Sequence, residues 1–343
     1  MSDSSILTPV REAHRFDVPR LVEYLSQRME GDFSAMEVLQ FEGGQSNPTY
    51  QLTVGGKRYV LRKKPPGQLL KSAHQVDREY RVMKALESTA VPVPLMYVFC
   101  EDEDVMGTSF YVMEHVEGRV FTDVTLGSMK KEDRKELLRH AIEVMVALHQ
   151  VDLEAVGLAD YGRPGNYYER QISRWTKQYR ASETEDISAM NELMLWLPNN
   201  IPESRGTCLA HGDFRIGNTV VHPTEPKVAA VLDWELSTTG HGLADLGYLS
   251  LMYHQEEAQG FDWKAAGFPN EQELVGMYCQ CAGLEKIENW NFYVIYNLFR
   301  LSAIVQGVYK RGLDGNASSE SWRERSAAGK YMSARAWDLV KSI

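Results

Sequence analysis

One segment of the chain constrains its fold more than any other, because it combines strand-forming sequence with a fixed spacing of polar residues. Residues 208–234 read as strand, loop and strand, and they are embedded among segments with helical periodicity. The loop contains His211 and Asp213, with Asn218 five residues after the aspartate; Asp233 follows fifteen residues later, at the end of an apolar run. The segment therefore predicts a short β-structure that carries a functional loop inside a largely helical region.

The first third of the chain predicts strands, and the remainder predicts helices. Strands are expected at residues 38–41, 50–54, 58–62, 95–100 and 109–113, with a Gly-Gly hairpin turn at 55–56 and one helix at 74–88. Further helices are expected at residues 130–150, 166–180, 187–197, 271–282, 290–310 and 319–340. A β-rich first part joined to an α-rich second part is an α+β layout.

Charge and cysteine content exclude several classes of protein. The net charge of −10 argues against a nucleic-acid or anionic-membrane binder, which usually carries the opposite sign. The four cysteines, at 100, 208, 279 and 281, have neither zinc spacing nor the density of a disulfide framework, so free thiols are expected. Since the first 20 residues lack an apolar signal region and no apolar run reaches the length of a membrane span, we expect a cytoplasmic protein without a membrane partner.

The polar loop has the H-x-D-x-x-x-x-N spacing of a protein-kinase catalytic loop. In such a loop the aspartate, here Asp213, orients or accepts the proton of an attacking hydroxyl, and the asparagine, here Asn218, is a magnesium ligand. Asp233 could hold the same metal, because Mg²⁺ prefers oxygen ligands. A lone His-x-Asp is usually a turn and an Asp after a strand is often a helix cap. The occurrence of both features together, after a strand-rich region of the sequence, favours a catalytic role.

The strand-rich part offers candidates for nucleotide phosphate binding. Gly43, Gly44, Ser46 and Asn47 lie between two predicted strands, where backbone N–H groups could approach phosphates, although most Gly-Gly pairs are simple turns and G-x-G-x-x-G is absent.

Basic residues follow at the end of the next predicted strand. Arg62 ends that strand and Lys64 faces the same side, so either could contact phosphate or remain a solvated charge. Glu79, on the following helix, is the candidate ion-pair partner of Arg62, or else a surface carboxylate.

Seven motifs occur in an order that resembles the aminoglycoside/choline phosphotransferase family. They are GGQSN, YVLRKKPP, DREYRVMKAL, YVMEHVEG, HGDFRIGN, VLDWE and LADLGY, and the resemblance as a whole extends over residues 41–309. The sequence is most similar to the kinase-like domain fused to some acyl-CoA dehydrogenases and to its free-standing relatives. The resemblance implies a bilobal protein-kinase-like fold, with an N-lobe at residues 1–114 and a C-lobe at residues 115–343. It also implies ATP and Mg²⁺ as cofactors and a small-molecule hydroxyl as the acceptor.

The resemblance also implies residue roles. Asp213 corresponds to the catalytic base, His211 to the structural histidine of the loop, Asn218 and Asp233 to the Mg²⁺ ligands, and Asp245 to a buried aspartate that braces the loop.

Further roles concern the nucleotide. The backbones of Glu114 and Val116 would bind adenine, and Arg62 replaces the usual lysine, which is chemically reasonable because arginine binds phosphate in a bidentate manner. Trp234-Glu235 replaces Phe-Gly and no activation loop follows, so a protein substrate is not expected.

The acceptor is expected to be anionic rather than polycationic. The candidates for its binding are Arg170, Arg174, Arg215, Glu235 and Arg300, with Arg215 inside the catalytic loop. Arg300 interrupts an apolar stretch and should therefore have a partner or a ligand, because burying an unpaired charge is costly. These arginines could instead form salt bridges with Glu169, Asp245 or Glu235. A hydroxy acid or hydroxyacyl-CoA is the expected substrate.

Three alternatives remain open at this stage. The chain could be an aminoglycoside-type or choline-type kinase, or a nucleotide-binding pseudokinase, which the replacement of lysine by Arg62 would permit. A metal-dependent phosphoesterase could use His211, Asp213, His222 and Asp233, but it would leave the upstream motifs unexplained. P-loop and α/β-hydrolase motifs are absent from the sequence.

Overall fold

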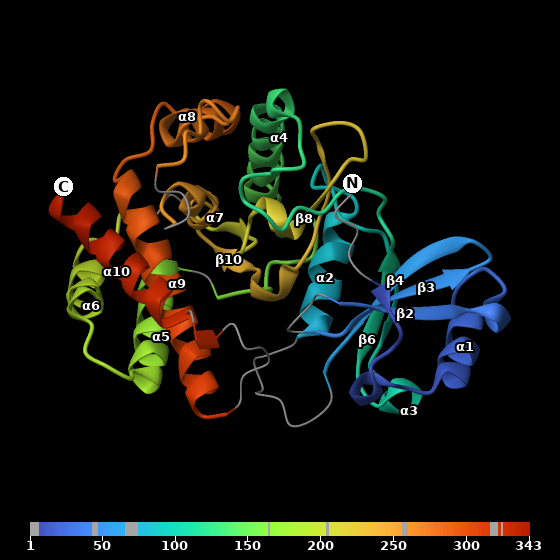
Figure 1. The fold of residues 1–343 in the computed structure, drawn as a ribbon. Coiled ribbons are helices and arrows are strands. Elements are labelled where there is room, and N and C mark those ends of the chain that lie inside the picture. Colours follow the sequence, from blue (N-terminus) through green and yellow to red (C-terminus); the bar gives the residue numbers. More distant parts are fainter. Residues whose placement is uncertain are drawn as a thin grey trace. The chain divides into compact units, whose positions relative to one another are not determined.

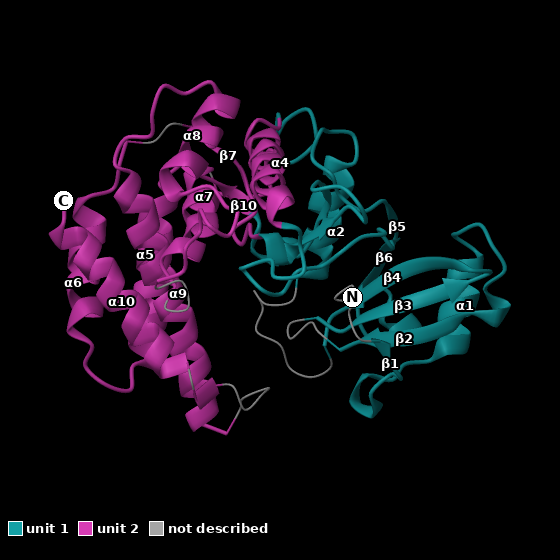
Figure 2. Ribbon diagram, turned by 45° about the horizontal axis from the view of Figure 1, so that its top comes forward, with its two compact units in different colours: residues 1–130, 152–158, 216–237 teal, residues 131–151, 159–215, 238–343 magenta. Residues whose placement is uncertain are grey.

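A computed structural model describes residues 7–42, 47–65, 75–163, 165–203, 206–255, 260–315, 322–323 and 325–343. The chain forms two compact units, which Figure 2 distinguishes by colour. The first unit comprises Met1–Lys130, Asp152–Leu158 and Ile216–Ser237, and the second comprises Lys131–Val151, Ala159–Arg215 and Thr238–Ile343. The first unit thus continues beyond residue 114 and includes a later segment of the chain; the lobe boundary at 114 stays a prediction.

The first unit is built on a six-stranded antiparallel sheet (Figure 1). Its order is β1-β2-β3-β4-β6-β5, formed by Leu7–Thr8, Glu37–Phe41, Thr49–Val54, Lys57–Lys63, Phe110–Glu114 and Met96–Cys100. Gly55 and Gly56 join β3 to β4 with φ values of 55° and 82°, which is the left-handed conformation that a tight hairpin requires. In the register of β4, Arg62 lies between Thr49 of β3 and Tyr111 of β6.

The two faces of this sheet are covered by different helices. Helix α1 (Val18–Ser26) and the short α3 (Glu103–Met106) cover one face, whose core contains Leu21, Phe33, Leu52, Leu61, Phe110 and Val112. Helix α2 (Val76–Leu86) contacts β5 and β6. Because successive side chains of a strand point to opposite faces, Arg62 and Tyr111 lie on the face opposite Leu61 and Val112.

A second β-structure of the first unit comes from the later segment of the chain. Strands β8 (Thr219–Val221) and β9 (Val228–Val231) form an antiparallel hairpin, preceded by the 3₁₀ turn Ile216–Asn218 and followed by the 3₁₀ turn Trp234–Leu236. This last turn contacts α2. The chain thereby places Asp233 in the same compact unit as Arg62 and Glu79.

The second unit is mainly helical. Its helices are α4 (Lys131–His149), α5 (Tyr167–Ser182), α6 (Ser188–Asn199), α7 (Leu243–Leu249), α8 (Glu271–Ala282), α9 (Trp290–Leu313) and α10 (Arg325–Lys341). Helix α9 packs against α5, α7 and α10, and α4 packs against α8. A two-stranded antiparallel sheet of β7 (Cys208–Ala210) and β10 (Thr238–Gly240) supports the loop that follows β7.

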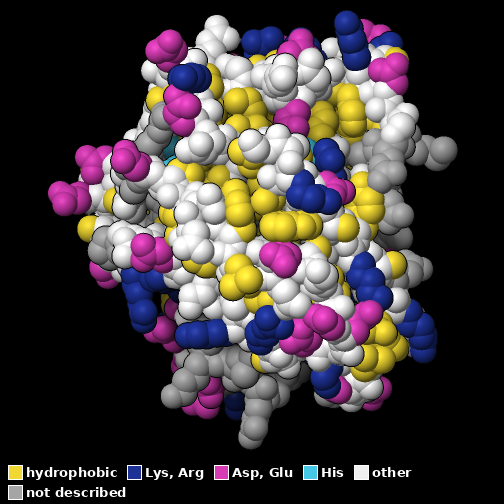
Figure 3. All heavy atoms as spheres, turned by 90° about the vertical axis from the view of Figure 1, so that its left-hand side faces the viewer, with side chains coloured by type: hydrophobic (Ala, Val, Ile, Leu, Met, Phe, Trp, Pro, Cys, Tyr) yellow, Lys and Arg dark blue, Asp and Glu magenta, His cyan; other side chains and the backbone are white. Residues whose placement is uncertain are grey.

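The structure agrees with most elements expected from the sequence, and the α+β class is confirmed. Helices α1 and α7 are additions that the sequence analysis did not predict. No helix within the described ranges is both long and apolar enough to cross a membrane. Acidic and basic side chains are intermingled over the face shown in Figure 3, with hydrophobic side chains between them.

Candidate active site

Arg62 is the centre of an ion-pair cluster in the first unit. Its guanidinium lies 3.3 Å from the carboxylate of Glu79, 2.9 Å from that of Asp233 and 4.0 Å from that of Glu235. The Arg62 side chain is only 13% exposed, so solvent screens these contacts weakly. The arginine thus joins helix α2 to the segment after β9. The buried Nε–H of Arg62 has no hydrogen-bond partner among the described residues.

Glu79 is buried, and both of its carboxylate oxygens have polar partners. One carboxylate oxygen accepts a hydrogen bond from Asn47 at 2.9 Å and the other accepts one from the Tyr111 hydroxyl at 3.1 Å. Burial raises the pKa of Glu79 to about 7, although the neighbouring Arg62 cation opposes this increase. The side chain of Asn47, which the sequence placed in a phosphate-binding turn, is therefore occupied in supporting Glu79. Gly43, Gly44 and Ser46 lie outside the described residues.

Asp233 and Asn218 present oxygen atoms to one pocket of the first unit. The backbone N–H of Leu232 donates to the Asn218 carbonyl at 2.8 Å, which holds the two segments side by side. Asp233 has a left-handed backbone, with φ of 64°, a conformation that non-glycine residues rarely adopt and that clusters at functional sites. A carboxylate and an amide oxygen are suitable Mg²⁺ ligands, and the cation already paired with Asp233 shows that the site favours positive charge.

The pocket that these residues line has a volume of about 340 Å³. Its lining is mostly apolar at one end, with residues such as Val60, Met83, Met113, Val220 and Leu232. Glu114, His115 and Val116 follow β6 along its wall, and Arg62, Asn218 and Asp233 provide its polar side. An apolar pocket with a few convergent polar groups is typical of a site for a flat, partly polar ligand.

The second unit contains the first part of the polar loop, up to Arg215. Asp245, at the start of α7, is fully buried, and its two carboxylate oxygens accept hydrogen bonds from the backbone N–H groups of His211 and Gly212, each at 2.7 Å. His149 lies 3.2 Å from the same carboxylate. Burial favours the neutral acid, but the hydrogen bond and the charge of His149 outweigh it and lower the pKa of Asp245. The carboxylate therefore fixes the backbone just before Asp213.

The loop backbone turns sharply at this point. Gly212 has φ of 81°, which a residue with a side chain would adopt only at a cost. The Nδ1 atom of the buried His211 accepts a hydrogen bond from the backbone N–H of Asp213 at 3.2 Å. The buried His211 thus helps to fix the conformation of the loop backbone. The side chain of Asp213 is partly exposed.

Tyr248 and Arg300 lie close to Asp213 in the second unit. The Tyr248 hydroxyl hydrogen-bonds Asp213, and burial together with this negative charge raises the pKa of Tyr248. The Arg300 guanidinium lies 5.3 Å from the centre of the Tyr248 ring. Sequence reasoning missed Tyr248, although its position three residues after Asp245 places it on the adjacent turn of α7.

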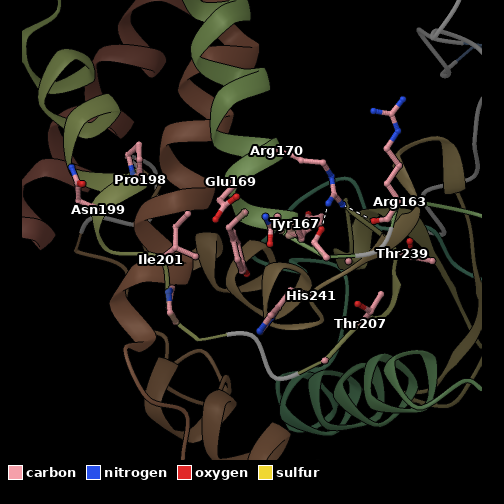
Figure 4. Close-up of a pocket in the computed structure, with 16 residues that line it drawn as sticks. Arg163, Tyr167, Glu169, Arg170, Pro198, Asn199, Ile201, Thr207, Thr239 and His241 are labelled. Carbon is pink, nitrogen blue, oxygen red and sulfur yellow. Dashed lines mark hydrogen bonds between the residues drawn. The ribbon is translucent and has the colours of Figure 1, made fainter.

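The other predicted acceptor-binding arginines lie in different environments. Arg174 is exposed and stacks on the Trp175 ring at 5.1 Å, and Arg215 is exposed. Arg170 lines a pocket of about 380 Å³ but donates hydrogen bonds to the carbonyl oxygens of Arg163 and Gly165, as the dashed lines of Figure 4 show. It therefore ties the preceding loop to α5. Glu235 lies in the first unit, beside Arg62.

The described residues contain no group of three or more His, Cys, Asp or Glu side chains arranged to hold a metal ion. A His-rich metal site of the kind that the phosphoesterase alternative requires is thus not found within that part of the chain.

Comparisons with known proteins identify the family of the chain. A profile described as "Phosphotransferase enzyme family" matches residues 37–272. Acyl-CoA dehydrogenase family member 11 from Gallus gallus is 46% identical over 348 residues, which cover 97% of this chain and 45% of that protein. The chain therefore spans less than half the length of this relative.

Solved structures show the same similarity. A crystal structure from Ralstonia eutropha JMP134, described as an aminoglycoside phosphotransferase, has a TM-score of 0.87 and 44% identity and covers 96% of this chain and 99% of its own. A thermostable mutant of aminoglycoside phosphotransferase APH(4)-Ia, in a ternary complex with AMP-PNP and hygromycin B, has a TM-score of 0.59 and 18% identity and covers 94% of this chain and 98% of its own. At that identity the second likeness concerns the fold alone. The chain belongs to the phosphotransferase enzyme family and has a kinase-like fold.

Proposed function

We propose that the protein transfers the γ-phosphoryl group of ATP to the hydroxyl of an anionic small molecule, a hydroxy acid or its coenzyme A thioester. The observation that carries the proposal is the pocket of about 340 Å³ in the first unit, which Arg62, Asn218 and Asp233 line together with mostly apolar residues. Such a pocket suits an adenine ring at one end and phosphates at the other.

In this proposal the nucleotide is held by the first unit. The backbone after β6, at Glu114 and Val116, bonds the adenine edge, and the turn that contains Gly43, Gly44, Ser46 and Asn47 covers the phosphates. Arg62 contacts the α- and β-phosphates, and its orientation is fixed by Glu79 at 3.3 Å. A planar guanidinium can bind two phosphate oxygens at once, so it can replace the lysine usual at this position.

Asn218 and Asp233 are the residues that would hold Mg²⁺. Both line the nucleotide pocket and both offer oxygen ligands. A bound Mg²⁺ supplies neutralisation of the charge on the phosphate oxygens. Asp233 is 35% exposed at its side chain, so it remains accessible to a cation that arrives with the nucleotide.

Asp213 is the proposed catalytic base. It orients the acceptor hydroxyl, whose oxygen forms a bond to the γ-phosphorus while the bond from that phosphorus to the β,γ-bridging oxygen breaks. ADP leaves with the electron pair of the broken bond, and the hydroxyl proton passes to Asp213 and then to solvent. Positioning and electrostatic stabilisation supply most of the acceleration in such transfers.

Two observations support an anionic acceptor. Arg300 is a nearly buried cation close to Asp213, with Arg215 nearby in the same loop. The relative from Gallus gallus carries the name of an acyl-CoA dehydrogenase, an enzyme class that acts on acyl thioesters. A hydroxy acid or hydroxyacyl-CoA fits both observations better than choline or an aminoglycoside, which are cationic and need an acidic pocket.

The test is ATP-dependent phosphorylation of a substrate panel followed by mass spectrometry. The panel contains hydroxyacyl-CoAs, free hydroxy acids, choline and aminoglycosides. We expect product from the first two classes, reduced at least about a hundredfold by Asp213→Ala with ATP binding retained, and unchanged in Asp186→Ala, a variant of an exposed carboxylate in the same unit. Robust turnover of choline or aminoglycosides alone would refute the acceptor class. Tight Mg·ATP binding without any product would instead favour a pseudokinase.

A further inference from the structure

Arg300 is a buried cation close to the proposed catalytic aspartate. It lies in the middle of α9 and is 5% exposed. Burial lowers its pKa, but the neighbouring Tyr296, Tyr167, Tyr248 and Asp213 outweigh this effect and raise it. Within the described ranges, its guanidinium contacts aromatic rings and forms no salt bridge or hydrogen bond with a protein group. Since direct pairing stabilises a buried cation further, the guanidinium is suited to bind an oxygen-bearing ligand.

Two aromatic rings hold the guanidinium in place. Its central carbon lies 5.6 Å from the centre of the Trp175 ring, in α5, and 5.3 Å from that of Tyr248, in α7. A cation over an aromatic face is attracted without using its N–H groups. The rings therefore fix the side chain while its five N–H donors remain available for an oxygen-bearing group.

Tyr248 also connects this cation to Asp213. Its ring faces Arg300, and its hydroxyl donates a hydrogen bond to the Asp213 carboxylate. Burial and that carboxylate both raise the pKa of Tyr248, so the hydroxyl keeps its proton and remains a donor. The cation and the carboxylate therefore both contact the same tyrosine side chain.

We propose that Arg300 binds the acyl end of the acceptor, through a carboxylate or a thioester carbonyl oxygen, while Tyr248 positions Asp213 beside the acceptor hydroxyl. This inference rests on the proposed function and specifies which end of the acceptor is recognised. It favours acceptors that carry a hydroxyl and an acyl oxygen in one small molecule, because Arg300 and Asp213 both contact Tyr248.

The first test compares acceptors that differ only in the acyl oxygen. We would measure kcat and KM for 3-hydroxybutyrate, 4-hydroxybutyrate, their coenzyme A thioesters and the diol 1,3-butanediol, in wild type, Arg300→Gln and Arg300→Lys. For acids and thioesters, Arg300→Gln should lower kcat/KM about 30-fold or more, the range for removing one partner of a buried charge pair. The KM for ATP and the kcat/KM for the diol should change less than about threefold, well below that range. Arg300→Lys should be intermediate, because an ammonium is a single-point donor.

The matched control is Arg180→Gln. Arg180 lies on α5, the helix that carries Trp175, but it is exposed and pairs with Glu183 at 2.8 Å. Its replacement should leave every constant unchanged. If Arg300→Gln lowers kcat/KM more for the free acids than for the thioesters, the carboxylate is the ligand of Arg300. If it lowers kcat/KM equally for both, the ligand is the acyl oxygen that they share. An equal loss on acids, thioesters and diol would overturn the assignment, because it would show that Arg300 is needed for the fold of the site and not for recognition.

Tyr248→Phe separates positioning from binding. It keeps the ring that contacts Arg300 and removes the hydroxyl that bonds Asp213. The variant should lower kcat, shift the acidic limb of the pH profile of kcat, and leave the KM for the acceptor unchanged. A rise in the acceptor KM with an unchanged kcat and pH profile would contradict the positioning role.

Binding without turnover distinguishes this inference from the proposed function. Calorimetric titration of 4-hydroxybutyrate and its thioester into wild type should give binding heat that Arg300→Gln abolishes and Arg180→Gln retains. Binding heat without ATP-dependent product would refute the proposed reaction but would still support Arg300 as the residue that binds the acyl end. Equal kinetic constants in wild type and Arg300→Gln, or the absence of binding heat in wild type, would refute this role of Arg300.

Discussion

Arg62 and Asp233 form an ion pair at 2.9 Å, although 171 positions separate them in the chain. The pair places a protein cation on the carboxylate that is proposed to hold Mg²⁺. Arg62 also contacts Glu79 at 3.3 Å, so one side chain serves as the counter-ion of two carboxylates. A competition between this guanidinium and a metal ion for Asp233 follows directly from the geometry.

Removal of Arg62 should therefore strengthen metal binding in the absence of nucleotide. We expect Arg62→Met to increase the affinity for Mn²⁺ about tenfold, which corresponds to an ion pair worth about 1.4 kcal/mol. The KM for ATP should rise in the same variant. Free Mn²⁺ would be titrated by electron paramagnetic resonance.

The control for this experiment lies on the same strand. Arg58 of β4 pairs with Glu117 at the exposed surface, so Arg58→Met removes an equivalent charge without touching Asp233. Equal Mn²⁺ affinities in the two variants would show that Arg62 does not compete for the site.

Glu79 should give the folding stability a characteristic pH dependence. Its pKa in the folded state, about 7, exceeds the ordinary glutamate value of 4.5, so the folded protein binds more protons than the unfolded chain between these values. The contribution of Glu79 is complete below pH 4.5 and is lost as the pH rises to 7. Each pKa unit corresponds to about 1.4 kcal/mol. The difference in unfolding free energy between wild type and Glu79→Gln should therefore decrease from pH 5 to pH 7.5.

Urea denaturation across this pH range measures the effect. Asp77→Asn is the control, because it removes a partly exposed carboxylate from the same helix. A difference between wild type and Glu79→Gln that stays constant with pH, or that increases, would contradict the raised pKa.

Asp245 should be among the most important polar residues for stability. Replacing it with alanine leaves the buried N–H groups of His211 and Gly212 without an acceptor, at a cost of about 2–5 kcal/mol. Because the pKa of Asp245 is lowered, its contribution is present above about pH 4 and is lost as the pH falls further. Chemical denaturation at pH 7 would detect the loss, and a change below about 0.5 kcal/mol, typical of a surface site, would refute the bracing role.

The cost of backbone strain can be measured by comparing alanine substitutions at Gly212, which has a left-handed backbone, and at Gly276, which lies in a helix. Gly212→Ala places a Cβ at φ of 81°, which should cost about 1–2 kcal/mol and reduce kcat by displacing Asp213. Gly276 lies inside α8 with open space around it, so Gly276→Ala should stabilise the protein by about 0.5–1 kcal/mol. Thermal unfolding and steady-state kinetics check both. Similar effects of the two substitutions would rule out a special role for the loop backbone.

The sequence predicted those features that depend on local pattern. The hairpin at Gly55-Gly56, the α+β class and the family all follow from periodicity and motif order, and the comparisons confirm the family. The facing of Arg62 and Glu79 follows from strand alternation and helix position, and the structure places them 3.3 Å apart.

Other features depend on contacts between distant segments, which a single sequence does not reveal. The pairing of Arg62 with Asp233 could not be predicted, because the motifs assigned Arg62 to the nucleotide phosphates and Asp233 to Mg²⁺. The support of Glu79 by Asn47 and Tyr111 depends on the register of three strands. Helix α1 was missed because its apolar face is short: only Leu21 and Leu25 are buried.

The separation between Arg62 and Asp233 also has a consequence for synthesis of the chain. Glu79 leaves the ribosome soon after Arg62, but Asp233 follows 171 residues later, roughly 10–30 s at usual rates of translation. During that interval Glu79 is the sole carboxylate of this cluster available to the arginine, and the hairpin of β8 and β9 does not yet exist. The first unit can therefore be completed only after part of the second has been made, and a nascent chain arrested before residue 233 would contain its sheet but lack Asp233.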